Sequence, residues 1–321
     1  MTSALIAATA TDDAATAHPR LDDLIRRARV HAADSPQRIA LIYPCDGAAI
    51  EAAVRIADEA LGLPVLVGPR AAMEVAARAV GTDLARFEIV DTGDAPADAA
   101  RRGVMLVREG RAAVLMKGSL HTDELMSAIV HREKGLRTAR RISHVFLFDL
   151  PRYPKLLGLA DCVVNISPDL KTKCDILANA IELLQALGVA EPKVGVLAAV
   201  ESVNPAIPAT LDAQALVEMA REGSWPGAVV EGPFGFDNAI SAEAARIKRM
   251  DSRVSGDADL LLVPDLNAGN MLYKSFNYIG GGECAGLVLG ARVPIVLTSR
   301  ADSLLARIAS VALAVLSVRR A

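Results

Sequence analysis

The sequence predicts an α/β protein built from mostly parallel sheets with helices on both faces. Short β-branched or apolar runs alternate with longer stretches rich in Ala, Leu, Glu and Arg along nearly the whole chain. Such alternation is typical of parallel strands joined by right-handed helical crossovers. Several of the short runs are apolar throughout, as expected for strands that are buried on both faces. A length of 321 residues suggests two domains, at roughly 100–200 residues each.

The apolar runs predict eleven strands in chain order. They are Ile39–Tyr43, Val65–Val67, Phe87–Val90, Ala113–Met116, Val145–Phe148, Val163–Ile166, Val194–Leu197, Val229–Glu231, Leu260–Val263, Leu287–Leu289 and Ile295–Leu297. The stretches between them carry helical periodicity. The expected helices are Leu21–Ala33, Ala48–Leu61, Ala95–Arg108, Thr122–Val130, Leu170–Leu187, Ala213–Glu222, Ala242–Met250, Met271–Ile279 and Leu304–Val318.

Residues with known preferences mark some of the helix ends. Ser167–Asp169 offers an N-cap, a proline at the first helical position and an acid in the first turn. Gly188 follows Leu187, where a left-handed residue ends a helix. Asp212 is expected to be the N-cap of the next helix.

Proline-rich turns indicate where the domains divide. Two prolines within Asp149–Pro154 can continue neither a helix nor a central strand. A second break is expected near Gly290–Pro294. The first domain would then hold residues 18–152 and 293–321, the second residues 153–292, and residues 1–17 would form a flexible tail. In this arrangement the chain passes twice between the two domains, so both domains line the cleft between them. Such a cleft is a common place for a small-molecule site.

Charge and composition exclude several classes of protein. The chain has 35 Lys and Arg against 38 Asp and Glu, a net charge of −3 and 3% aromatic residues, which argues against a nucleic-acid partner. The four cysteines are far apart and read as reduced thiols of a cytoplasmic protein. Met1–Ala17 lacks the basic region of a signal peptide, and the apolar stretch Ile308–Val318 is too short to span a membrane. We therefore expect no membrane partner.

Two strand ends carry polar residues suited to an anion. Lys117–Thr122 follows a strand and precedes a helix, so Gly118 lets backbone N–H groups approach an anion, and Ser119 and the helix N-terminus add donors. The bland alternative is an ordinary βα turn. Ser299–Ser303 likewise lies between the last strand and the last helix, the edge at which α/β proteins bind ligands.

Within Ser299–Ser303, each polar side chain has a candidate chemical role. Arg300 can hold a phosphate with two parallel hydrogen bonds. Ser299 can donate to an oxyanion, and Asp302 can accept a proton. The bland alternative is that Asp302 or Ser303 caps the last helix and that Arg300 lies at the surface.

Other motifs have simpler explanations. Ser119, His121 and Asp123 suggest a hydrolase triad, but residues alternating on one loop rarely converge as a triad does. Gly280–Ala285 matches the pattern G-x-G-x-x-A, yet it follows a helical stretch and lacks a βαβ unit, so a turn is expected.

Two further loops follow strands in the middle of the chain. Gly232–Ala239 and Val263–Met271 are rich in Gly, Asn and Asp. This composition is typical of tight turns, but it also fits loops that line a cleft and contact a substrate. In the second case, Asn270 is expected to bind substrate.

Together, these segments resemble the phosphate acetyl/butyryltransferase family, especially its phosphotransbutyrylase-like branch. The matching segments are Lys117–Thr122, Ala139–Phe148, Gly232–Ser241, Gly256–Tyr273 and Val293–Ser303. The resemblance implies a two-domain fold like that of the isocitrate and isopropylmalate dehydrogenases, a homodimer, and an active site in the interdomain cleft. It implies reversible transfer of an acetyl or butyryl group between coenzyme A and inorganic phosphate. Coenzyme A is then a substrate, and neither a cofactor, a metal nor a covalent acyl-enzyme is expected.

The resemblance also assigns residues. The family's Ser-Arg pair corresponds to Ser299 and Arg300, and its Gly-x-x-His-Thr segment to Gly118, His121 and Thr122. Ser299 would then stabilise the oxyanion that forms when the thiolate attacks an acyl phosphate, and Arg300 would neutralise the departing phosphate.

One catalytic position departs from the family. Phosphotransacetylases carry an Asp seven residues after the Ser, where this chain has Ala306. Asp302 is the nearest acid and the expected base. The arginines that hold phosphate in the acetyl enzymes have no clear match, so Lys117 is expected to take part of that role.

Two alternatives from other classes stay open. One is an NAD-dependent decarboxylating dehydrogenase on the same fold, which would need clustered Asp ligands for a divalent metal. The other is a non-catalytic protein that binds coenzyme A or another anion. Phosphate-dependent thiol release from an acyl-CoA, without added magnesium or NAD, separates both from the transferase.

Overall fold

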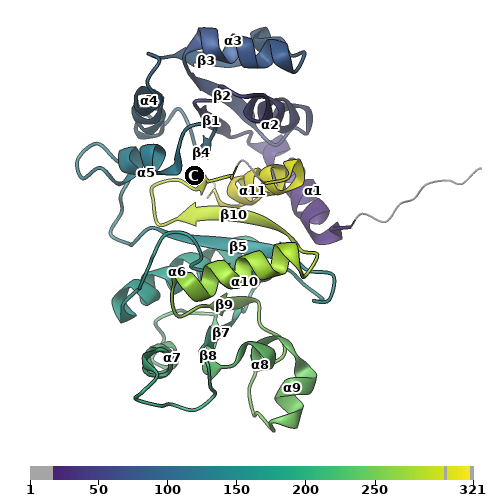
Figure 1. The fold of residues 1–321 in the computed structure, drawn as a ribbon, viewed down its shortest axis with the longest axis vertical. Helices are drawn as coiled ribbons and strands as arrows, with labels where there is room; N and C mark the ends of the chain where they lie inside the picture. The colour runs from purple at the N-terminus through teal and green to yellow at the C-terminus, as the bar shows by residue number, and fades with distance from the viewer. Residues whose placement is uncertain (1–16, 300–301, 319–321) are drawn as a thin grey trace, which may run out of the picture.

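The computed structural model describes residues 17–299 and 302–318, and its strands form one continuous sheet. The strand order is β3-β2-β1-β4-β11-β10-β5-β6-β9-β7-β8, which runs from top to bottom in Figure 1. The strands are β1 (Arg38–Ile42), β2 (Leu63–Gly68), β3 (Glu88–Asp91), β4 (Val114–Lys117), β5 (Ser143–Asp149), β6 (Leu157–Ala160), β7 (Lys193–Leu197), β8 (Val229–Phe234), β9 (Leu260–Leu262), β10 (Glu283–Leu289) and β11 (Ile295–Val296).

Strand directions divide the sheet into two parallel parts. Strands β3, β2, β1, β4 and β11 pair in parallel, and so do β6, β9, β7 and β8. Between these parts, β10 is antiparallel to β11 and to β5, and β5 is antiparallel to β6. The expected α/β class with a mostly parallel sheet is therefore confirmed.

Helices cover both faces of this sheet. They are α1 (Pro19–Asp34), α2 (Gly47–Asp58), α3 (Arg70–Ala79), α4 (Pro96–Arg108), α5 (Thr122–Val130), α6 (Leu170–Ala186), α7 (Pro208–Arg221), α8 (Phe236–Ile240), α9 (Ala242–Ile247), α10 (Leu266–Tyr278) and α11 (Leu304–Ser317), with a 3₁₀ turn at Leu84–Arg86. Helix α1 packs against α11, so the two ends of the described chain lie side by side (Figure 1).

The hydrophobic core differs between the two faces. On one face, a single core extends across the sheet under α1, α2, α6, α7 and α11. On the other face there are two separate cores, one under α4 and α5 and one under α8 and α10. The interruption between these two cores is where a ligand can reach the sheet.

All expected strands but Val163–Ile166 are confirmed within a few residues. That segment forms a turn, because the Oδ1 atom of Asp161 accepts hydrogen bonds from the backbone N–H groups of Val163 (2.9 Å) and Val164 (3.0 Å). The strand lies just before it, at β6. Its short Leu-Gly-Leu-Ala sequence carries no alternation that distinguishes a strand from a turn.

The expected helices are confirmed, including the start of α6 at Leu170, but two capping expectations are wrong. Helix α6 begins after Asp169, whose carboxylate accepts the N–H of Thr172, so Pro168 lies outside the helix. Asp212 lies within α7 and its carboxylate pairs with Lys173 at 2.6 Å. Gly188 does adopt the left-handed conformation expected at the end of α6, with φ of 90°.

Two helices were not expected. The chain forms α3 after β2, and α8 begins inside Gly232–Ala239, which was expected to be a tight turn or a cleft-lining loop. The beginning of α10 also extends into the second expected loop, because Asp265 caps the helix by accepting the N–H of Ala268.

The two expected domain breaks fall in connections between strands. The first lies between the antiparallel strands β5 and β6, and the second between β10 and β11. Residues 1–16 of the expected tail are outside the described residues. Over residues 17–299 and 302–318, none of the helices has both the length and the apolar character needed to cross a bilayer.

Candidate active site

A pocket of about 560 Å³ lies where the sheet's second face is interrupted. It is bounded by the carboxyl ends of β4 and β11, the start of α5, the face of β5 and β10, and helix α10. Its lining residues are Lys117, Leu120, His121, Thr122, His144, Phe146, Val163, Asn270, Tyr273, Lys274, Asn277, Tyr278, Gly282, Glu283, Leu297, Thr298, Ser299, Asp302 and Ser303.

Lys117 supplies positive charge at the wall of this pocket. It is the last residue of β4 and is only 7% exposed. Its Nζ atom donates hydrogen bonds to the backbone oxygens of Gly118 (3.2 Å) and Leu120 (3.3 Å). The loop that follows β4 thus holds the ammonium group in place at the pocket.

The turn between β11 and α11 is held from two sides. The carboxylate of Asp302 accepts the backbone N–H of Ser299 at 2.6 Å. Arg307, buried in α11, donates from Nη2 to the backbone oxygen of Ser299 (2.9 Å) and from Nε to that of Asp302 (3.3 Å). Since charge-assisted hydrogen bonds are the stronger ones, they fix the positions of Ser299 and Asp302 at the pocket.

Burial raises the pKa of Asp302 above its usual value. The N–H of Ser299 and the charge of Arg307 oppose this rise, Glu283 adds to it, and Lys117 opposes it. A carboxylate whose pKa is raised toward neutrality is a better proton acceptor, which suits a general base. Lys117, from β4, and Asp302, before the last helix, line the same pocket.

Ser303 links the last helix to β10. Its hydroxyl oxygen accepts the N–H of Ala306 at 2.9 Å and so caps α11, and it also donates to a carboxylate oxygen of Glu283 at 2.5 Å. Of the two caps expected at this helix, Ser303 is therefore the one present. The contact leaves Asp302 available to the turn and to the pocket.

Two aromatic rings also line the pocket. The rings of Phe146 and Tyr273 stack with centroids 4.4 Å apart and an interplanar angle of 3°. Gly286 lies beside them, and a Cβ atom there would come within 2.7 Å of Phe146. Glycine at this position therefore makes room for the ring.

Most of the residues predicted from the sequence lie at this pocket. Those lining it are Lys117, His121, Thr122, Asn270, Ser299 and Asp302. Arg300 lies outside the described residues. The pocket therefore brings together predicted residues from three separate parts of the chain.

Gly118 and Ser119 are not among the lining residues and pack instead against the loop after β1. A Cβ atom on Gly118 would lie 2.6 Å from the backbone oxygens of Ile42 and Tyr43. The hydroxyl of Ser119 donates to the oxygen of Tyr43 (2.7 Å) and accepts the N–H of Cys45 (3.0 Å). These contacts shape the turn that carries Lys117.

Sequence reasoning missed several residues of the pocket. His144, Phe146, Tyr273 and Thr298 all line it. All four lie inside family-matching segments, and the i, i+2 spacing of His144 and Phe146 on a strand places these two on one face. This spacing is the sequence feature from which a shared position at the pocket could have been predicted. The contribution of Tyr273 depends on how α10 packs, which no local pattern reveals.

The run of glycines at 280–282 lies between α10 and β10, at a turn as expected. Among the described residues, no group of three or more His, Cys, Asp or Glu side chains is placed to hold a metal ion.

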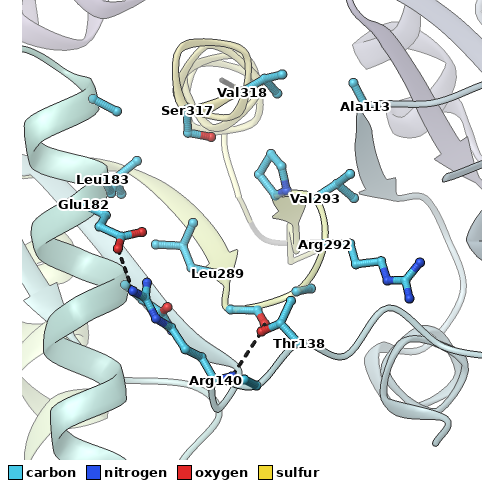
Figure 2. A pocket seen from close by; sticks show the side chains of 16 residues that line it. Ala113, Thr138, Arg140, Glu182, Leu183, Leu289, Arg292, Val293, Ser317 and Val318 are labelled. Atoms are coloured by element: carbon cyan, nitrogen blue, oxygen red, sulfur yellow. Dashed lines mark hydrogen bonds and ion pairs between the residues drawn. The ribbon is translucent and has the colours of Figure 1, made fainter. Parts of the chain in front are cut away.

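A larger cavity, of about 670 Å³, lies at the opposite edge of the sheet. Figure 2 shows its lining, with Arg140 paired with Glu182 at 2.6 Å and Val293 and Ala113 near the starts of β11 and β4. It contains none of the predicted site residues. Because ligands of α/β sheets bind at the carboxyl ends of strands, the smaller pocket is the candidate active site.

Known proteins resemble this chain in sequence. Residues 94–315 match the family described as phosphate acetyl/butaryl transferase. A phosphate acetyltransferase of Rhizobium meliloti is 50% identical over 94% of each chain. A phosphate butyryltransferase of Clostridium beijerinckii is 36% identical over 88% of this chain and 94% of that protein.

The fold agrees with these matches. A branched-chain phosphotransacylase from Enterococcus faecalis superposes with a TM-score of 0.78 at 30% identity, covering 89% of this chain and all of the other. Fold and sequence therefore define an α/β acyltransferase. The chain belongs to the phosphate acetyl/butyryl transferase family.

The fold is also similar, to a lesser degree, to that of a dehydrogenase. The 4-hydroxythreonine-4-phosphate dehydrogenase from Klebsiella pneumoniae superposes with a TM-score of 0.54 at 15% identity, over 89% of this chain and all of that one. At this level of identity the likeness concerns the fold alone.

Proposed function

We propose that this protein reversibly transfers a short acyl group, acetyl or butyryl, between coenzyme A and inorganic phosphate. One observation carries the proposal in a chain of this family: Lys117, Ser299 and Asp302 line the same pocket. A cation, a hydroxyl and a carboxylate of raised pKa are the groups that direct acyl transfer requires.

The proposed chemistry is direct attack. In the direction of thioester synthesis, Asp302 takes the proton of the thiol, which is a modest demand because a thiol has a pKa of about 8.5. The thiolate sulfur forms a bond to the acyl carbon, and the bond from that carbon to the phosphate oxygen breaks. Phosphate leaves with the bonding electron pair, and the proton held by Asp302 passes to solvent or phosphate.

Ser299, Arg300 and Lys117 are proposed to stabilise the charges that develop. The Ser299 hydroxyl donates to the oxygen of the attacked carbonyl, while Arg300 and the ammonium of Lys117 neutralise the departing phosphate. His121, Thr122 and Asn270 are proposed to contact the substrates from the pocket wall. Holding both substrates in one pocket supplies orientation, which is a large part of the rate gain in such reactions.

We also propose that the chain forms two domains, each containing part of the sheet, and that they meet at this pocket. The two interior cores on the pocket face support this division, because they are separated where the pocket lies. A homodimer in the cytoplasm, with acyl-CoA and phosphate as substrates of one direction of the reaction, completes the proposal.

The function is tested by incubating the protein with acetyl-CoA or butyryl-CoA and measuring thiol release with and without phosphate. We expect release that requires phosphate and needs neither magnesium nor NAD. Replacement of Arg300 by alanine should reduce turnover by roughly 10²–10³, as for loss of one preorganised donor. Thiol release that is independent of phosphate would contradict the proposal.

A further inference from the structure

Several residues that line the pocket carry a buried polar atom without a hydrogen-bond partner in the described part of the chain. Buried side-chain atoms without a hydrogen-bond partner in the described part of the chain are His18 Nδ1, His31 Nε2, His144 Nδ1, Asn238 Oδ1, Asn277 Oδ1 and Thr298 Oγ1. Three of these six, on His144, Asn277 and Thr298, belong to residues that line this one pocket. They come from β5, from α10 and from the end of β11. Buried polar groups are normally hydrogen-bonded, so their concentration here indicates that a ligand supplies the missing partner.

His144 is the most deeply buried of the three. It is 1% exposed, and its ring lies against Phe146 with centroids 4.2 Å apart. Its backbone N–H donates to Oδ2 of Asp161 at 3.2 Å. That carboxylate also accepts hydrogen bonds from the N–H groups of Val163 and Val164 and from the side chain of Asn165, so it is well occupied without the imidazole.

The imidazole of His144 is held in its neutral form. Burial lowers the pKa of His144 to about 4, although the nearby charge of Asp161 opposes this shift. At neutral pH the ring therefore offers one N–H donor and one acceptor nitrogen, but no charge. Neutral imidazole serves in this way as a hydrogen-bond donor to a carbonyl in other enzymes.

Thr298, just after β11, offers the same kind of contact. It is 4% exposed, and it directly precedes Ser299. A hydroxyl and a neutral imidazole match an uncharged acceptor better than a phosphate, which is matched in this pocket by the charge of Lys117. The group that fits both chemistry and place is the carbonyl oxygen of the acyl substrate.

We propose that His144 and Thr298 hydrogen-bond the acyl carbonyl oxygen and that the acyl chain lies along the stacked rings of Phe146 and Tyr273. This inference rests on the proposed function and adds the residues that position the acyl group. These donors act together with Ser299, and they pull electron density from the carbon that the thiolate attacks.

The test compares His144→Leu and Thr298→Val, which remove the hydrogen bonds, with His144→Gln, which keeps a neutral N–H donor. We expect the first two to lower kcat by about 10², as for loss of an oxyanion donor, and His144→Gln to recover part of that loss. Affinity for coenzyme A without an acyl group should stay unchanged. Because the removed atoms have no partner within the protein, the unfolding temperature of both variants should not fall. His31→Leu removes an equally unpartnered nitrogen outside the pocket and serves as the control with unchanged kcat.

A spectroscopic readout makes the test independent of turnover. Bound acetyl-CoA labelled with ¹³C at the carbonyl should show a carbonyl stretch shifted to lower frequency in the wild type, with the shift reduced in His144→Leu and Thr298→Val. Wild-type kcat and wild-type carbonyl frequency in both variants would overturn the inference while leaving the acyltransferase intact. Absence of phosphate-dependent transfer in the wild-type protein would instead overturn the proposed function itself.

Discussion

The carboxylate of Asp302 accepts the backbone N–H of Ser299 at 2.6 Å, so the proposed base also shapes the turn that carries the proposed oxyanion donor. The two residues are three positions apart, between the last strand and the last helix. A single side chain therefore links proton transfer to the geometry of the site.

Replacing Asp302 by asparagine separates these two roles. The amide oxygen can still accept the N–H of Ser299, but it cannot take a proton from a thiol. We expect kcat to fall by about 10²–10⁴, the usual contribution of a general base, while the unfolding temperature changes little. Steady-state kinetics and thermal unfolding check this expectation. The matched control is Asp123→Asn, an exposed residue in the first turn of α5, and unchanged turnover in Asp302→Asn would remove Asp302 from the mechanism.

The raised pKa of Asp302 also predicts a pH dependence of stability. Because the folded protein binds this proton more tightly than the unfolded chain, the free energy of unfolding contains a favourable contribution at low pH. That contribution is lost as pH rises through the folded-state pKa. Asp302→Asn does not titrate, so its stability relative to the wild type should increase from below pH 4 toward neutrality. Urea unfolding of both proteins at several pH values measures this. If the free energy of unfolding of Asp302→Asn minus that of the wild type decreased with rising pH, the pKa of Asp302 would be lowered by folding rather than raised.

Arg307 positions the same turn from inside the protein. Its guanidinium donates to the backbone oxygens of Ser299 and Asp302. Arg307→Met removes hydrogen bonds from a charged donor, which typically contribute about 1.5–3 kcal/mol, and should also reduce kcat. Arg307→Lys keeps the positive charge but loses the planar set of guanidinium donors. Its unfolding temperature and kcat should therefore lie between those of the wild type and those of Arg307→Met. Thermal unfolding and steady-state kinetics check this, with Arg292→Lys at an exposed position as the control. A wild-type unfolding temperature together with a wild-type kcat in Arg307→Met would contradict the role assigned to Arg307.

Gly286 is expected to control which acyl chains fit. A Cβ atom at this position would lie 2.7 Å from the ring of Phe146 and 3.0 Å from that of His144, so Gly286→Ala must push the rings toward the pocket. We expect kcat/KM to fall more for butyryl-CoA than for acetyl-CoA. Gly195→Ala is the control, since its Cβ atom would meet neighbours only at 3.4 Å. An equal loss for both thioesters would place the acyl chain elsewhere.

Much of the architecture followed from sequence because its signals are local. Apolar runs marked all the strands except β6, where the chain is too short and too rich in small residues to show a pattern. The strand expected at 163–166 failed because a side chain, that of Asp161, takes up the backbone N–H groups that a strand would offer to its neighbour. Only the folded structure shows this competition.

The site was predictable where strand ends carry polar residues. Lys117, Ser299 and Asp302 were identified because each lies at the carboxyl end of an expected strand, just before an expected helix, in a segment that resembles the family. His144 was not identified, since its role depends on the absence of a partner for a ring nitrogen deep in the sheet. Gly118 and Ser119 lie next to the site in sequence, but their contacts are with the loop after β1.

The most direct test of the site measures initial rates against phosphate concentration for Lys117→Met and Lys117→Arg. If Lys117 faces the phosphate in the same pocket as Ser299 and Asp302, the KM for phosphate should rise by about tenfold or more in Lys117→Met, because each 1.4 kcal/mol of lost charge stabilisation is a factor of ten. Lys117→Arg, which keeps the charge, should lose less. A wild-type KM for phosphate in a folded Lys117→Met protein would contradict the assignment of the reaction to this pocket.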